Sequence, residues 1–167
     1  MKRVLCILCS SAIIIILCIS GCGAAKDPFA ADNAIKGQVD DLHYAVPENA
    51  VLDKASNDSF HIYNIPLKNS KEEYCLSVLC FSAKTEDEYN ETIQNMKSVE
   101  YENETMTEFL GKKIDYGYIA TIDDDGQMST ILYVAKNQKF YIIQYSIVTG
   151  LYDQTVWDNF YSQLKFV

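Results

Sequence analysis

Residues 114–148, which read IDYGYIATIDDDGQMSTILYVAKNQKFYIIQYSIV, decide the fold of this chain. Apolar and polar side chains alternate over residues 114–122, a pattern that predicts a half-buried β-strand. Two further apolar stretches follow, separated by the pairs Asp125-Gly126 and Asn137-Gln138, which are typical of tight turns. We therefore expect an antiparallel meander of three strands.

The turn positions determine which side chains of the meander share a face of the sheet. One face collects Tyr116, Tyr118, Ile131, Tyr133, Phe140 and Ile142, and the other collects Ile119, Leu132, Val134, Tyr141, Ile143 and Tyr145. Both faces are apolar, so both need cover from other elements. Tyrosine suits binding surfaces, which makes Tyr116, Tyr118 and Tyr133 a candidate binding face. The alternative is that they are half-buried strand residues with hydroxyls at the rim.

The rest of the chain contains elements that can supply this cover. The capping box Thr85-Glu86-Asp87-Glu88 begins an amphipathic helix that ends near Val99. Asp153 caps a second helix with an apolar stripe. We expect an α+β fold, a mainly antiparallel sheet with one inserted helix and one C-terminal helix, arranged like an α/β/α sandwich. Shorter strands are predicted over residues 42–46, 50–55, 60–65, 74–82 and 104–110.

This order of elements, closing with an aromatic helix that ends in Leu164-Lys165-Phe166, resembles the PsbP-like and Mog-like α/β/α sandwiches. The resemblance covers residues 40–167 and rests on element order. It implies binding and assembly roles without catalysis, although a fold does not by itself define a function.

The N-terminus has the pattern of an export signal. Lys2 and Arg3 precede an apolar run over residues 4–19, and small residues then lead to Cys22. The tetrapeptide Ile19-Ser20-Gly21-Cys22 resembles the lipobox of bacterial lipoproteins. The resemblance implies that residues 1–21 are removed, that Cys22 carries lipid, and that the protein is anchored at the extracytoplasmic face of the cell membrane. An uncleaved signal anchor is the alternative.

Composition limits the classes of partner and the domain organisation. Beyond the signal, residues 22–39 are small and polar and predict a lipidated N-terminus with a flexible tether, and residues 40–167 suffice for a single domain. These 146 residues carry 12 basic and 23 acidic side chains, a formal charge of −11. Such a surface repels nucleic acid and anionic headgroups, so neither is expected as an electrostatic partner. The resemblance to lipoproteins implies that the membrane is reached through lipid on Cys22.

Signatures of catalysis, of cofactors and of strong metal sites are missing from the sequence. Cys75 and Cys80 lie five residues apart in one predicted strand, which puts them on opposite faces and beyond disulfide reach. The acidic run Asp123-Asp124-Asp125 precedes Gly126, but an EF-hand alignment puts Leu132 where a bidentate glutamate is needed. A hairpin turn is the better interpretation, with a weak cation site as the alternative.

These observations predict a non-catalytic lipoprotein that binds or assembles an envelope component. A receptor or sensor for a small ligand, with a tyrosine-lined pocket, is the alternative. An enzyme with a dispersed carboxylate site is a third hypothesis, because the pairing of acid and base groups depends on the fold.

Overall fold

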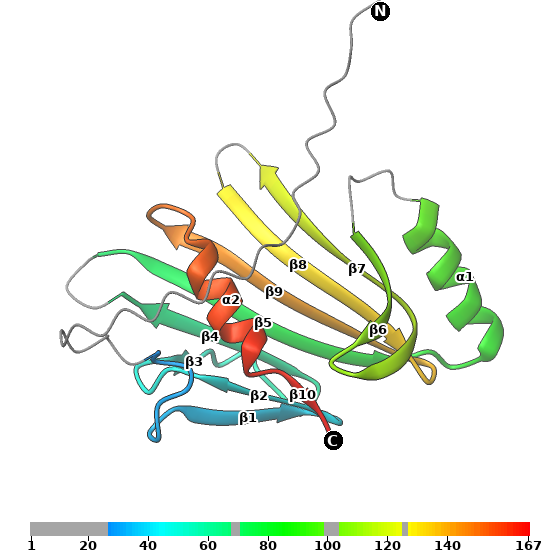
Figure 1. Cartoon of the computed structure of the whole chain (residues 1–167), viewed down its shortest axis with the longest axis horizontal. Helices are drawn as coiled ribbons and strands as arrows, with labels where there is room; N and C mark the ends of the chain where they lie inside the picture. Colours follow the sequence, from blue (N-terminus) through cyan, green and yellow to red (C-terminus); the bar gives the residue numbers. More distant parts are fainter. Residues whose placement is uncertain (1–26, 68–70, 99–103, 125–126) are drawn as a thin grey trace, which may run out of the picture.

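The described part of the chain forms two antiparallel sheets and two helices (Figure 1). The computed structural model describes residues 27–67, 71–98, 104–124 and 127–167. The larger sheet has seven strands in the order β3-β4-β5-β9-β8-β7-β6. Their bounds are Val51–Leu52 (β3), Phe60–Pro66 (β4), Glu73–Ser82 (β5), Glu104–Phe109 (β6), Lys112–Asp124 (β7), Gln127–Lys136 (β8) and Lys139–Thr149 (β9).

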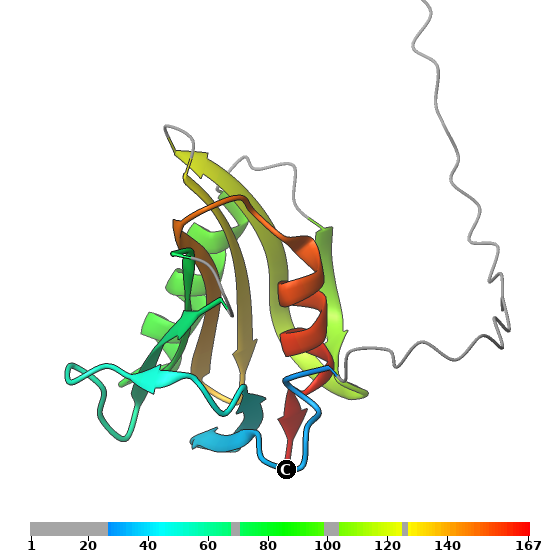
Figure 2. The same cartoon turned by 90° about the vertical axis from the view of Figure 1, so that its left-hand side faces the viewer.

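A smaller sheet and both helices cover the larger sheet. The smaller sheet, in the order β1-β2-β10, contains Ile35–Val39 (β1), Leu42–Val46 (β2) and Lys165–Phe166 (β10). Helix α1 is Glu86–Ser98 and helix α2 is Gln154–Ser162. The two helices lie on opposite faces of the larger sheet (Figure 2). The α+β fold with one inserted and one C-terminal helix is confirmed.

The register predicted from the turns is confirmed in the meander. Tyr118 pairs with Tyr133, and Tyr133 pairs with Ile142, so the three side chains share one face. Asn137 and Gln138 form the two-residue turn between β8 and β9, with φ angles of 53° and 62°. Positive φ at both central residues is the conformation that a tight hairpin requires.

Two apolar clusters form on the two faces of this sheet. The larger one lies between the sheet on one side and α2 with the smaller sheet on the other, and Phe160 of α2 is fully buried within it. The smaller cluster lies under α1, where Tyr89 and Ile93 pack against β7, β8 and β9. Both sheet faces are thus partly covered, but by elements of different size.

The helix caps agree with the sequence in most details. The side chain of Asp153 accepts a hydrogen bond from the backbone N–H of Thr155, as an N-cap does. The Thr85 hydroxyl accepts from the N–H of Glu88 at 3.2 Å, but the Glu88 carboxylate accepts from Lys84 at 2.7 Å rather than from Thr85. In a regular capping box the Glu88 carboxylate would accept from the N–H of Thr85, so this hydrogen bond is shifted by one residue.

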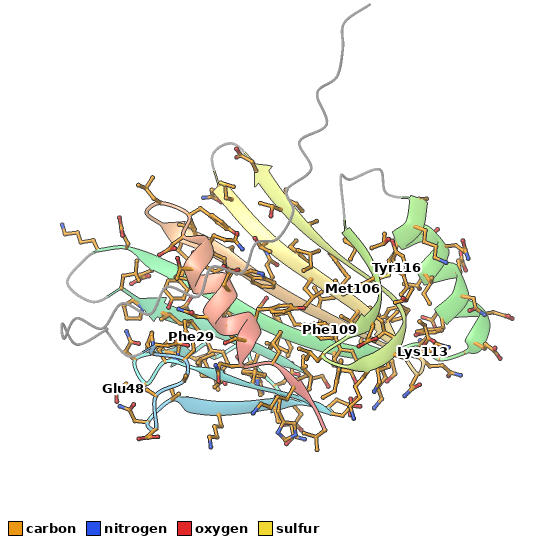
Figure 3. All side chains as sticks on the ribbon, viewed as in Figure 1. Phe29, Glu48, Met106, Phe109, Lys113 and Tyr116 are labelled. Atoms are coloured by element: carbon orange, nitrogen blue, oxygen red, sulfur yellow. The ribbon has the colours of Figure 1, made fainter. Side chains whose placement is uncertain are left out.

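The prediction of a flexible tether over residues 22–39 is wrong for its second half. Phe29 is 1% exposed, and its ring lies 6.1 Å from that of Phe160 beside α2 (Figure 3). The following residues form β1, which pairs with β2. The burial of Phe29, which contributes about 1.5–3 kcal/mol, and the pairing of β1 with β2 both hold this segment on the domain.

Two shorter elements also differ from expectation. The strand predicted over residues 50–55 is reduced to the two residues of β3, where Val51 is 59% exposed. The C-terminal helix ends at Ser162, and residues 165–166 form β10 against β2. The partner of β10 lies more than 120 residues away in the sequence, so no local pattern indicates that pairing.

Candidate functional site

The predicted tyrosine face exists, but most of it belongs to the core. Tyr116 and Tyr118 are 9% and 5% exposed and pack in the cluster under α1. The rings of Tyr118 and Tyr133 stack with their centroids 4.7 Å apart. Only Tyr133 of the three is partly exposed. The structure therefore brings these residues together as packing partners, with Tyr133 at the boundary of an exposed area.

That exposed area, here called the open face, lies beside α1 on the same side of the larger sheet. Strand pairing aligns its side chains in three rows across β4, β5, β9 and β8. Every one is partly exposed. The members of the open face are Ile62, Asn64, Cys75, Ser77, Leu79, Ser129, Ile131, Tyr133, Ile142, Gln144 and Ser146.

The open face is chemically unlike the rest of the surface. Its side chains are aliphatic, aromatic, hydroxyl, carboxamide or thiol, and none of these eleven carries a charge. Ile62, Leu79, Ile131 and Ile142 belong to neither apolar cluster, although they are strong strand formers. A solvated sheet face normally alternates with polar residues, whereas this one keeps four aliphatic side chains partly in water.

A second candidate is a pocket of about 280 Å³ where the smaller sheet meets the start of β4 and the end of β5. Asp40, the first residue of the β1–β2 turn, has a φ of 54° and projects to this pocket. Its carboxylate pairs with the Lys139 ammonium at 2.5 Å and accepts a hydrogen bond from the Cys80 thiol at 3.6 Å. Asp58 and Ser59 complete the opposite wall.

The neighbouring Asp41 links three parts of the chain. Its carboxylate accepts a hydrogen bond from the Tyr141 hydroxyl and lies 3.5 Å from the Lys136 ammonium. Its backbone carbonyl accepts from the N–H of Val167 at 3.0 Å. Burial alone would raise the pKa of Asp41. The opposing effects of the Tyr141 hydrogen bond, a backbone hydrogen bond, Lys136 and Lys139 are together larger, so the net shift of the pKa is downward. The network fixes the β1–β2 turn and the C-terminus against the sheet.

The pocket thiol is held in its protonated form. Burial, followed by the field of the Asp40 carboxylate, raises the pKa of Cys80 to about 12. A thiolate is the nucleophilic form of cysteine, so this thiol is poorly suited to attack a substrate. Through Asp40 and Lys139, the arrangement stabilises the β1–β2 turn.

Alkylation tests this conclusion. At pH 8, native Cys80 is expected to react with iodoacetamide about a thousandfold more slowly than an exposed thiol, because its thiolate fraction falls with a pKa near 12 instead of 9.0. Peptide mapping by mass spectrometry separates it from the other cysteines. Since the folded pKa is the higher one, Cys80 also favours folding below pH 9 and loses that contribution as pH rises towards 12. Reaction at the rate measured in denaturant would contradict the assignment.

The remaining sequence candidates have structural roles. Cys75 and Cys80 are both free, one on the open face and one in the larger cluster. The Tyr44 hydroxyl contacts His61 Nδ1, and the rings of His61 and Tyr63 meet edge to face. Within the described residues, no group of three or more His, Cys, Asp or Glu side chains could hold a metal ion. The acidic turn, for which a weak cation site was the alternative interpretation, includes residues 125–126, which lie outside the described residues.

Cys22 and residues 1–21 also lie outside the described residues. In the part of the chain that the structure describes, no helix is long and apolar enough to cross a membrane.

Comparisons with known proteins add little to this picture. No protein-family model matches the chain, and no curated protein matches it. Among solved structures, it is similar to a protein from Bacteroides thetaiotaomicron VPI-5482 whose crystal structure was determined at 1.50 Å resolution, with a TM-score of 0.46 and 7% identity. The match covers 76% of this chain and 45% of that one, so this chain spans less than half of its length.

Proposed function

We propose that this protein is a lipid-anchored, extracytoplasmic lipoprotein that works as a non-catalytic binding module of the cell envelope. Its anchor is Cys22, and its partner is a protein segment with an uncharged, partly aliphatic surface. The observation that carries this function is the open face, eleven partly exposed side chains without a charge on a chain whose formal charge is −9.

The chemistry of the open face favours a neutral partner. Aliphatic groups lose contact with water when a partner covers them, which contributes about 25 cal/mol for each Å² buried. The hydroxyl and carboxamide groups between them can hydrogen-bond to a partner backbone. A charged partner surface would lose hydration there without gaining an opposite charge.

The area of the open face favours a short protein segment over a second copy of this chain. Strands lie about 4.8 Å apart and successive side chains on one face about 6.8 Å apart, so four strands and three rows span roughly 400 Å². Stable interfaces bury about 800 Å² on each partner. The open face alone therefore suits a segment or a transient contact.

A tyrosine-lined pocket for a small ligand is less well supported. Tyr116 and Tyr118 are buried beneath α1 and have little surface left to offer.

Photo-crosslinking in intact cells tests the proposed partner. A photoreactive residue at Ile131 should capture one reproducible envelope protein, and Ile142→Lys should reduce that capture at least about tenfold because it places a charge in the interface. Leu52→Lys is the matched control: it also replaces an exposed aliphatic residue, but on β3, and it pairs with Tyr63 rather than with the open face.

One result would contradict this proposal. Equal capture by the Ile142→Lys and Leu52→Lys proteins, with melting temperatures unchanged from the parent, would contradict binding through the open face.

A further inference from the structure

A groove of about 410 Å³ lies on the other flank of α1, away from the open face. One side of it is the helix surface formed by Glu86, Tyr89, Asn90, Ile93, Gln94 and Lys97. The other side is the β8–β9 turn with Asp115 of β7 beneath it. Its volume falls in the range of about 300–1,000 Å³ that small-molecule sites occupy.

Four carboxamides line this groove, two from each side. Asn90 and Gln94 lie one helical turn apart on α1, and Asn137 and Gln138 are the two residues of the turn. Among the described residues, none of these four side-chain amides hydrogen-bonds to another part of the chain. Each carboxamide has two donor hydrogens and an acceptor oxygen, so the groove presents donors and acceptors together.

The charges in the groove are nearly balanced. Asp115 is already engaged, since it accepts a hydrogen bond from the Tyr89 hydroxyl at 2.7 Å and another from the N–H of Asn137 at 3.1 Å. The Lys97 ammonium lies over the Tyr116 ring, 5.4 Å from its centre. Glu86 and Asp115 outnumber Lys97, so the groove carries a formal charge of −1 and disfavours an anionic ligand, while four neutral carboxamides supply most of its hydrogen-bonding groups.

The second residue of the β8–β9 turn is a glutamine, although its backbone conformation favours glycine. Gln138 has a φ of 62°, in the left-handed region where a non-glycine residue costs about 1–2 kcal/mol. Glycine is the usual residue at this position of such a turn. The hairpin turn requires this positive φ, and Gln138 contributes a carboxamide to the groove from that position.

We propose that this groove binds a neutral, hydroxyl-rich ligand, an uncharged oligosaccharide. A sugar hydroxyl both donates and accepts, which matches the four carboxamides. A peptide is less suited, because the sheet side of the groove is a closed hairpin turn without a free strand edge, and because Ile93 and Tyr89 are 7% and 6% exposed and offer little apolar surface. This site is separate from the open face and does not depend on it.

Titration of the full-length protein in detergent with neutral tetrasaccharides tests the site. The probes are the β-1,4-linked tetramers of glucose and of N-acetylglucosamine, and the readout is the NMR signals of side-chain amides. A saturable shift of Asn90, Gln94, Asn137 and Gln138 signals is expected. The double variant Asn90→Ala/Gln94→Ala should weaken binding by about tenfold or more, since two hydrogen bonds are lost.

The controls use the same helix and the open face. Asn95→Ala removes an exposed carboxamide outside the groove and should leave the affinity unchanged, and alanine at all three helix positions preserves folding because it is the best helix former. Ile131→Lys disturbs only the open face and should bind sugar normally. A negative result for sugar binding is therefore distinguishable from a negative result for protein binding through the open face. No saturable shift with either sugar at about 20 mM, or equal affinity in the double variant and Asn95→Ala, would overturn the assignment. Saturable binding of an uncharged peptide at these amides instead of sugar would overturn it in favour of a peptide site.

Discussion

A protein carrying Cys22→Ser is expected to lose all metabolic labelling by palmitate and to leave the membrane fraction. The reason is chemical, because serine lacks the thiol that the proposed lipid attachment requires. Two acyl chains contribute about 0.8 kcal/mol for each buried methylene, enough to hold a protein stably on a bilayer. Removing both chains therefore changes the distribution of the protein almost completely.

The apolar signal supplies a matched control for this substitution. Cys18 lies four residues before Cys22, inside the apolar run, and Cys18→Ser should keep both the label and the membrane location. Palmitate labelling that persists in the Cys22→Ser protein would contradict lipid attachment at that residue. Membrane retention without label would instead indicate an uncleaved signal anchor.

The second large effect is expected in the core. Phe160→Ala should reduce the free energy of unfolding by about 3–5 kcal/mol, the range for removing a fully buried phenylalanine. Phe160 is 0% exposed, and its ring lies within 6.4 Å of the ring centres of Phe29, Tyr44 and Trp157. One side chain thus joins the N-terminal segment, the smaller sheet and α2.

Denaturant titration followed by tryptophan fluorescence measures this loss. Phe81→Ala is the matched control: Phe81 is 43% exposed and stacks on Phe140 with ring centres 5.1 Å apart, so it should cost about 1 kcal/mol. A loss at Phe160 no larger than that at Phe81 would show that the three parts do not depend on this contact. Since domains are stable by only about 5–15 kcal/mol, the expected loss is a large share of the total.

Sequence reasoning succeeded where the determining contacts are local. The alternating pattern of the strand and the two-residue turn at Asn137-Gln138 are both short-range features, and together they predicted the observed pairing of Tyr133 with Ile142. Asp153 as an N-cap is equally local. Each of these depends on residues within one turn or one hairpin.

It failed where distant residues decide the outcome. The carboxylate of Asp41 and the hydroxyl of Tyr141 are 100 residues apart in the chain, and no spacing rule joins them. The open face could not be recognised because its apolar residues look like core residues in the sequence. Only the short length and position of α1 leave Ile131 and Ile142 outside both clusters.

One part of the groove, the β8–β9 turn, has an unusual residue that is visible in the sequence. A tight two-residue turn with glutamine at its second position departs from the usual glycine. Its combination with Asn90 and Gln94 on α1 depends on how the helix crosses the sheet, which the sequence does not specify.

The docking of Phe29 would hold an anchor at Cys22, as proposed above, close to one side of the domain. Cys22 is five chain steps before Asp27, where the described structure begins, so an acylated Cys22 can lie at most about 18 Å from that point. The anchored chain enters on the α2 side, since Phe29 packs on Phe160, whereas the open face and α1 are on the opposite side of the sheet. With so short a link to the anchor, the α2 side would face the bilayer and the open face would point away from it.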